Sequence, residues 1–247
     1  MRADFLISEM LCNFSVGKKG FKMYPTQTFD SSKADEIMLD LLRYIHQYYP
    51  IGLPEYYNQP RRMMERDHIL ANKISDLTEG KETAWSIFVR ELKQHNWELL
   101  DMAYIQFPSY VVRIKLKTPD FSTPEIFHSR ELVVVVSLLC PYYTIYYLDT
   151  YRFNTIRAAH HRYRPIFRIA FKEVLPEFSF NQDAHLKEVE DLTRLHFPSH
   201  NYASHGMLMQ RYLSPGIVLE GQSGEGPYPI YSYLFDYTFN IKNLEIR

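Results

Sequence analysis

Hydrophobic residues recur at helical spacing in three segments of the first hundred residues. In the segment 31–49, Ser31 or Ser32 can cap the first turn. The apolar positions of this segment form one stripe: Ile37, Met38, Leu41, Leu42, Ile45, Tyr48 and Tyr49. Segments 61–77 and 81–95 repeat the pattern, through Met63, Leu70, Ile74 and Leu77 and through Ala84, Trp85, Phe88, Val89 and Leu92. The periodicity predicts three amphipathic helices.

The hydrophobic period changes from helical to alternating near residue 110. The run "YVVRIKLK" places Val112, Ile114 and Leu116 on one face. Its other face carries Arg113, Lys115 and Lys117. Strict alternation over such a length is typical of a half-buried strand. The preceding "WELLDMAYIQF", residues 97–107, is predicted to supply the partner strand.

The most apolar stretch of the chain is "RELVVVVSLLCPYYTIYYLD", residues 130–149. Its apolar part, Leu132 to Leu148, is shorter than the roughly 20 residues that a membrane-spanning helix needs. Pro141 interrupts it, and four consecutive valines favour extended structure. The stretch therefore predicts two adjacent strands joined through Cys140 and Pro141. Because the first strand is apolar on both faces, we expect helices to cover it.

The last third of the chain predicts one more helix and a long strand. Asn181 can cap a helix over 181–197. The stripe of this helix is Leu186, Val189, Leu192 and Leu195. Towards the C-terminus, aromatic residues alternate as in a strand with an aromatic face: Tyr231, Tyr233, Phe235, Tyr237 and Phe239.

Together these segments predict a single α+β domain over residues 1–247, with a mainly antiparallel sheet covered by amphipathic helices. Residues 31–95 are expected to be rich in helix and residues 97–150 rich in strand. Residues 155–240 are expected to hold a helix followed by the C-terminal strands.

The charge and cysteine content restrict the class of protein. The formal net charge is -1, so no overall positive field attracts nucleic acid. The cysteines, Cys12 and Cys140, lie far apart in the sequence, which favours a reducing compartment. The N-terminal "MRADFLISEMLC" carries Asp4 and Glu9 within its apolar part and has no small-residue cleavage site, unlike a secretory signal. We expect a cytoplasmic protein without a membrane span.

The stretch "LHFPSHNYASHG" holds the candidate metal ligands His196, His200 and His205. Three imidazoles within ten residues could bind zinc or another transition metal. However, Pro198 interrupts the helical turn that an HExxH-type site needs, and the glutamate of that motif is absent. Histidines in a polar loop are the favoured interpretation, and a metal-dependent enzyme is the alternative.

Two other groups of side chains could bind a protein partner. The first is a basic cluster in "RAAHHRYR", which could contact an acidic surface: Arg157, His160, His161, Arg162 and Arg164. The second is a set of tyrosines on the predicted sheet: Tyr142, Tyr143, Tyr146 and Tyr147. Tyrosine and arginine dominate binding energy at many interfaces. Cys140 lies in the most apolar segment, where we expect a buried and unreactive thiol.

The C-terminal third has a further pattern. A helix ends in "HFPSHNY", "YLSPGIVLE" and a glycine-bearing loop follow, and "PIYSYLFDY" comes near the end. With the apolar strand pair, this pattern resembles bacterial conserved proteins of unknown activity, some of which look like immunity proteins that neutralise toxins exchanged between neighbouring cells. The resemblance covers a third to half of the chain. It implies a bacterial, cytoplasmic, non-enzymatic binding protein, and no catalytic residue can be carried over from it. We expect no cofactor.

Overall fold

The structure is a computed structural model, and it describes most of the chain between residues 31 and 236. The described residues are 31–51, 59–116, 126–153, 166–171, 182–213, 219 and 226–236. The chain divides into two compact units, Met1–Glu36 and Ile37–Arg247, and all the described strands belong to the second unit. The prediction of one domain over residues 1–247 stays a prediction.

The described residues form a six-stranded sheet in which the first five strands neighbour one another in chain order. Its strands are β1 Glu98–Asp101, β2 Ser109–Lys115, β3 Ile126–Ser137, β4 Tyr142–Phe153, β5 Ile166–Phe171 and β6 Asn201–Tyr202. Strands β1 to β5 pair in antiparallel order, and the short β6 pairs with β4 in parallel. A second small sheet joins β7 Tyr212–Leu213 to β8 Tyr228–Pro229.

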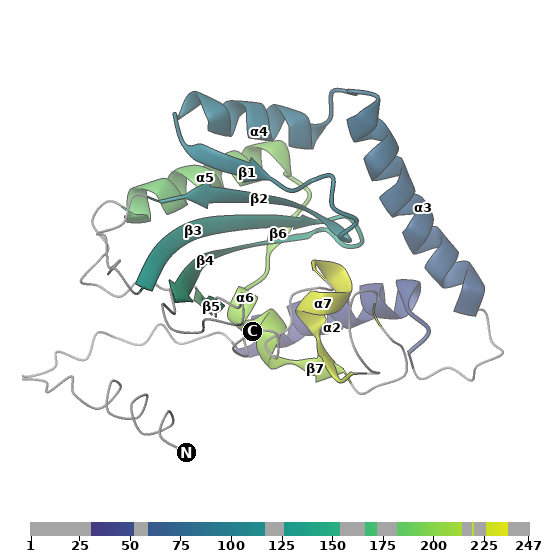
Figure 1. The fold of residues 1–247 in the computed structure, drawn as a ribbon. Helices are drawn as coiled ribbons and strands as arrows, with labels where there is room; N and C mark the ends of the chain where they lie inside the picture. The colour runs from purple at the N-terminus through teal and green to yellow at the C-terminus, as the bar shows by residue number, and fades with distance from the viewer. Residues whose placement is uncertain are drawn as a thin grey trace, which may run out of the picture. The chain divides into compact units, whose positions relative to one another are not determined.

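Helices cover both faces of this sheet (Figure 1). They are α2 Ser31–Tyr48, α3 Gln59–Thr78, α4 Ala84–Gln94, α5 Gln182–His196, α6 His205–Gln210 and α7 Ile230–Leu234. Helices α4 and α5 pack on one face. Residues of α2 from Ile37 onward, with α6 and α7, pack on the other. The predicted α+β class, with a mainly antiparallel sheet under amphipathic helices, is confirmed.

The valine run lies in β3, at the centre of the sheet. Val133 and Val135 point into the core shared with α2, α6 and α7. Leu132, Val134 and Val136 point into the core shared with α4 and α5. All five are buried, so apolar residues at successive positions of one strand are each accommodated by a helix layer. Among the described helices, none is long and apolar enough to cross a membrane.

The aromatic C-terminal segment folds as a helix where we predicted a strand. Residues 230–234 form α7, and the rings of Tyr231 and Phe235 stack with their centroids 5.5 Å apart. Positions 237 and 239 of the predicted strand lie outside the described residues. An alternating pattern cannot reveal this outcome, because α7 is buried all round and therefore needs no polar face.

Contacts from distant parts of the chain stabilise the end of α7. The hydroxyls of Ser109 and Ser137 donate hydrogen bonds to the carbonyls of Phe235 and Leu234. The Tyr49 hydroxyl donates to the carbonyl of Tyr233 at 2.7 Å. Helix C-termini leave carbonyls without partners inside the helix, and here side chains of the sheet and of Tyr49, directly after α2, supply those partners.

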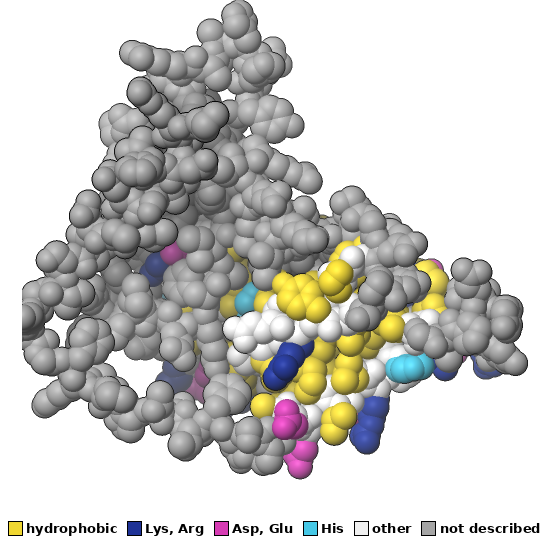
Figure 2. All heavy atoms as spheres, turned by 90° about the horizontal axis from the view of Figure 1, so that it is seen from below, with side chains coloured by type: hydrophobic (Ala, Val, Ile, Leu, Met, Phe, Trp, Pro, Cys, Tyr) yellow, Lys and Arg dark blue, Asp and Glu magenta, His cyan; other side chains and the backbone are white. Residues whose placement is uncertain are grey.

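The side of the molecule seen from below in Figure 1 is drawn in Figure 2. Its described side chains are largely hydrophobic, with basic and acidic side chains between them. Neither sign of charge dominates the part that can be seen, in keeping with the formal net charge of -1.

The packing of β3 predicts the effect of removing a central side chain. Leu132→Ala should lower the free energy of unfolding by about 2–5 kcal/mol, because Leu132 is fully buried and the cavity left behind cannot collapse completely. Urea denaturation followed by circular dichroism measures this loss. Leu39→Ala, at a position 59% exposed on α2, is the matched control and should change stability by less than about 0.5 kcal/mol. Equal losses in the two variants would contradict the assigned packing.

Candidate functional site

The loop of residues 102–108 joins β1 to β2 and begins where β1 ends at Asp101. A carboxylate oxygen of Asp101 accepts a hydrogen bond from the backbone N–H of Ala103 at 2.9 Å. Aspartate side chains that bond two residues ahead in this way start turns. The backbone N–H of Phe107 donates to the carbonyl of Ile105 at 2.8 Å. The strand that we predicted through residue 107 is therefore shorter, and a compact loop replaces its second half.

A buried lysine of α3 binds this loop. Lys73 is only 3% exposed, and its ammonium nitrogen lies 2.7 Å from the carbonyl oxygen of Ile105. It also lies 3.1 Å from the carbonyl oxygens of Phe107 and Ser109. A lysine ammonium has three hydrogens and no acceptor. All three hydrogens can thus be used on carbonyls of one short segment, which fixes that segment against α3.

Burial sets the protonation behaviour of Lys73. It lowers the pKa of the ammonium group to about 8, and the negative charge of Asp101 opposes this shift. The ammonium also lies 5.7 Å from the centroid of the Tyr110 ring, within the range of a cation–π interaction. Below about pH 8 the buried group is charged, with the carbonyls, the ring and a carboxylate around it.

The loop held by Lys73 exposes two large apolar side chains. Tyr104 is 63% exposed and Ile105 is 39% exposed. The Tyr104 hydroxyl reaches the carbonyl of Leu77 on α3, at 3.4 Å. Because the backbone below these side chains is tied down, they are displayed on a fixed rather than a freely moving loop.

An open groove of about 690 Å³ runs along α3 beside the loop. It is lined by Arg66, Asp67, Leu70, Ala71, Ile74, Ser75, Thr78, Glu79 and Gln106. The lining follows one side of α3 from Arg66 to Thr78 and continues to Glu79 in the turn after it; the helical part is about 18 Å long at the rise of an α-helix. Gln106 comes from the loop. We refer to this groove together with Tyr104 and Ile105 as the α3 surface.

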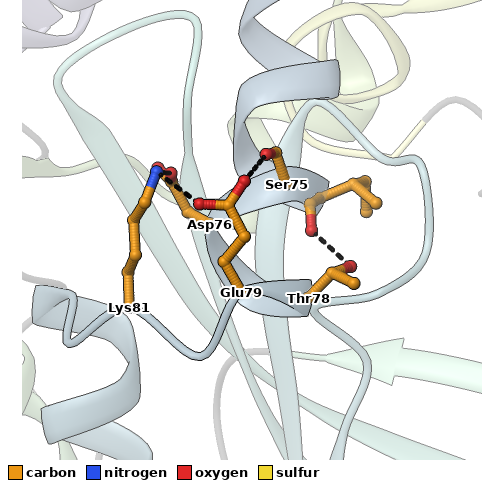
Figure 3. A network of polar contacts seen from close by, with 6 residues as sticks. Ser75, Asp76, Thr78, Glu79 and Lys81 are labelled. Atoms are coloured by element: carbon orange, nitrogen blue, oxygen red, sulfur yellow. Dashed lines mark hydrogen bonds and ion pairs between the residues drawn. The ribbon is translucent and has the colours of Figure 1, made fainter.

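A polar network fixes the C-terminal end of the α3 surface (Figure 3). Lys81 contacts Asp76 at 2.7 Å and Glu79 at 3.1 Å, and the Ser75 hydroxyl donates to Glu79 at 2.6 Å. The hydrogen bond from Ser75, followed by the contacts with Lys81, lowers the pKa of Glu79. Both carboxylates are thus compensated locally, and the end of the helix is held in one arrangement.

The structure does not bring the three candidate metal ligands together. The His196 ring lies 2.9 Å from a carboxylate oxygen of Glu91 on α4. The His200 ring lies 3.3 Å from the carbonyl oxygen of Ser137. His205 stacks on Tyr146 in the core below the sheet, with ring centroids 3.8 Å apart.

Burial also lowers the pKa of His205 to about 3, which keeps its ring neutral. Within the part of the chain that the structure describes, no three His, Cys, Asp or Glu side chains are placed to hold a metal ion. The positions of His196, His200 and His205 thus lend no support to a shared metal site.

The structure describes one of the two groups of predicted partner-binding residues, the tyrosines of β4. The tyrosines of β4 are all buried: Tyr142, Tyr143, Tyr146 and Tyr147. Tyr142 and Tyr146 belong to the core on one face of the sheet, and Tyr143 and Tyr147 to the core on the other. These four side chains build the sheet core and do not form an exposed surface. The basic cluster of Arg157, His160, His161, Arg162 and Arg164 lies outside the described residues.

A buried ion pair joins β3 to β4 in the sheet. Arg130 and Asp149 are direct cross-strand partners, and two nitrogens of the guanidinium contact the two carboxylate oxygens at 2.6 and 2.7 Å. The His128 ring lies 3.2 Å from the same carboxylate. A two-pronged contact of this kind aligns the strands, and a compensated buried charge is tolerated. We assign this cluster to the architecture of the sheet.

One residue in the sequence could have indicated the α3 surface, although the hydrophobic pattern alone did not. Lys73 comes three residues after Leu70 and four before Leu77, so it occupies the buried stripe of its helix. A lysine at such a position needs acceptors inside the protein. Tyr104 and Ile105 carried no comparable signal, because they resembled the continuation of a strand.

No protein-family model, curated protein sequence or solved structure matches this chain. The geometry of the α3 surface is therefore the observation from which a function can be argued.

The buried thiol of Cys140 leads to a prediction of low reactivity. Burial raises the pKa of Cys140 to about 12, so almost none of it is thiolate at pH 8, and thiolate is the reactive form. Iodoacetamide at pH 8 should leave the peptide that contains Cys140 unmodified in the folded protein and alkylate it in urea. Peptide mass spectrometry measures the two fractions. Rapid alkylation of Cys140 in the folded state would contradict the assigned burial.

Proposed function

We propose that this chain is a non-enzymatic protein-binding module that binds its partner through the α3 surface. The observation that carries the proposal is the pair Tyr104 and Ile105, exposed on a loop that Lys73 fixes beside an open groove. The family resemblance adds the expected role, which is neutralisation of a bacterial toxin by a cytoplasmic immunity-like protein.

The chemistry of Tyr104 supports its role as an anchor. Tyrosine is enriched among the residues that contribute most to binding, because it buries a large area and loses little rotational freedom. A side chain on a fixed loop loses still less entropy when it is bound, and such preorganisation raises affinity. Tyr104 therefore has the residue type and the support that an anchor needs.

The groove determines what kind of partner segment fits. Its apolar lining is Leu70, Ala71 and Ile74, in the middle of the α3 face. Charged side chains of both signs flank this part, with Arg66 and Asp67 towards one end and Glu79 at the other. We infer that the partner contributes a helix or extended segment with apolar residues at its centre and polar residues at its ends.

Immunity-like neutralisation requires the complex to be tight enough to block the toxin in the cell. Exposed apolar side chains beside a groove supply the central contact of such a complex, and the polar rim excludes water around it. The ion pairs already formed along α3 and in the turn after it leave only modest net charge for the partner to match. Affinity is therefore expected to depend on the apolar centre more than on salt concentration.

Replacing the anchor tests this function. Tyr104→Ala should weaken binding to the partner toxin by about tenfold or more, the effect of losing a central aromatic contact. Candidate partners are toxins encoded beside the gene, and isothermal titration calorimetry measures the affinity. Survival of cells that express the toxin together with each variant measures neutralisation.

Tyr212→Ala is the matched control, since Tyr212 is 49% exposed and belongs to the small sheet of β7 and β8. This variant should bind like the unmodified chain. Equal affinity of the Tyr104→Ala variant, or loss of binding in the Tyr212→Ala variant alone, would move the binding site away from the α3 surface. Failure of every neighbouring toxin to bind would overturn the immunity-like role.

A further inference from the structure

Strand β1 lies at one end of the sheet and, of the described strands, pairs with β2 alone (Figure 1). The backbone N–H of Met102 donates to the carbonyl of Val111 at 2.9 Å, which continues the register of the two strands by one position. Hydrogen-bonded pairs alternate along an antiparallel ladder, so Leu100 also bonds to β2, whereas the N–H and C=O groups of Leu99 and Asp101 point away from it. These outward-pointing groups have no hydrogen-bond partner in the described part of the chain.

The side chain at the centre of this edge is apolar and exposed. Leu100 lies between Leu99 and Asp101 and is 54% exposed. Glu98, on the same face of β1, contacts Lys115 of β2 at 2.9 Å, so its charge is compensated within the chain. A strand edge with unpaired backbone groups is a template on which another strand can add, and an uncompensated charge would oppose such an addition. Here the edge combines unpaired backbone groups with an exposed leucine.

We propose that β1 pairs with β1 of a second copy of this chain, in antiparallel orientation around a two-fold axis at Leu100. Leu99 of each copy then lies opposite Asp101 of the other. Each copy supplies the N–H and C=O groups of these two residues, so four hydrogen bonds form between the copies and no outward-pointing group of β1 is left over. The two Leu100 side chains lie opposite each other on one face of the joined sheet and leave water together.

The two neighbouring two-fold registers are less favourable than this one. An axis at Asp101 places its carboxylate directly opposite the same carboxylate of the second copy, which is destabilising. An axis at Leu99 brings Asp101 opposite Trp97, just before β1. The chain turns there, because Asn96 has a φ of 56° in the turn between α4 and β1. The register around Leu100 avoids both the like charges and the turn.

This pairing is independent of the proposed function. No residue of β1 lines the groove along α3, so the interface uses other residues. The paired strands are short, and small interfaces are typical of weak, transient complexes. We therefore expect self-association with a Kd of about 1–100 µM.

Sedimentation velocity of the full chain from about 1 to 100 µM tests the pairing. The unmodified chain should shift from monomer to dimer over this range. Leu100→Glu removes the apolar contact and places two carboxylates directly opposite each other, so it should weaken association by about tenfold or more. Leu195→Glu is the matched control, since Leu195 is 66% exposed on α5, and this variant should associate like the unmodified chain.

A cysteine at the axis tests the register itself. The two residues 100 would form a pair without hydrogen bonds between them, whose Cα atoms lie about 4.5 Å apart, within the range of a disulfide. Leu100→Cys should therefore give a disulfide-linked dimer under mild oxidation, as measured on a non-reducing gel. Leu195→Cys is the matched control, and the unmodified chain, with Cys12 and Cys140, gives the background.

Hydrogen–deuterium exchange gives a further measurement of the register. The amides of Leu99 and Asp101 should gain protection as the concentration rises from about 1 to 100 µM. The amide of Leu100 bonds to β2 in either state and should not change.

A chain that stays monomeric up to about 100 µM would overturn the proposal. A dimer that persists unchanged in the Leu100→Glu variant, or that gives no disulfide through Leu100→Cys, would overturn it too, because either result places the contact elsewhere. If Leu100→Glu fails to fold by circular dichroism, the cysteine variant decides. None of these measurements needs a toxin, so a failure of this pairing is distinguishable from a failure of the proposed binding function.

Discussion

The structure depends on one strand that is apolar on both of its faces. Strand β3 cannot expose either side to water, so its burial requires a helix layer above the sheet and another below it. The hairpin with β4 contributes side chains to both cores, because Leu132 lies opposite Tyr147 and Val133 lies opposite Tyr146 across the strands. Two positions from Leu132 along the same pair of strands, the salt bridge between Arg130 and Asp149 fixes the same register with charges instead of apolar contacts. A shift by one residue would bury unmatched charges and exchange the two faces.

Local patterns in the sequence were enough to predict this part of the fold. The helices α2, α3, α4 and α5 and the alternation of β2 are each encoded within about fifteen residues, and the structure confirms these elements. Leu195, the last residue of the stripe predicted for α5, is wrong as a core position, because it is 66% exposed. The hairpin register was also accessible in principle, since Arg130 and Asp149 are the first and last residues of the apolar stretch and pair directly. Where a segment packs against segments that are near it in the sequence, its hydrophobic periodicity indicates which of its side chains are buried.

The features that the sequence patterns missed depend on groups far away in the chain. Helix α7 is stabilised by Ser109, Ser137 and Tyr49, which lie from 97 to 184 residues away from their acceptors. An alternating aromatic pattern gives no sign of such contacts. Lys73 had a detectable anomaly, a charge within an apolar stripe, but its acceptors are carbonyls, which every residue possesses. Side-chain identities cannot indicate where backbone acceptors converge. For the same reason the predicted site residues were chosen by residue type, and the β4 tyrosines proved to be core.

Lys73 holds the loop in a way that costs more than hydration of the same carbonyls would. Backbone carbonyls of a surface loop are normally satisfied by water, and the cost of burying an ammonium group is then avoided. Here the desolvation of that group is large enough to lower its pKa to about 8, yet the side chain remains directed at the loop. The result of this interaction is a fixed loop on which Tyr104 and Ile105 are exposed. Exposed apolar side chains do not themselves stabilise a monomer. A costly interaction that orders such side chains is understandable if their order matters to a partner. The buried charge and the exposed anchor are thus two parts of one arrangement, and this connection is the physical basis for assigning binding to the α3 surface.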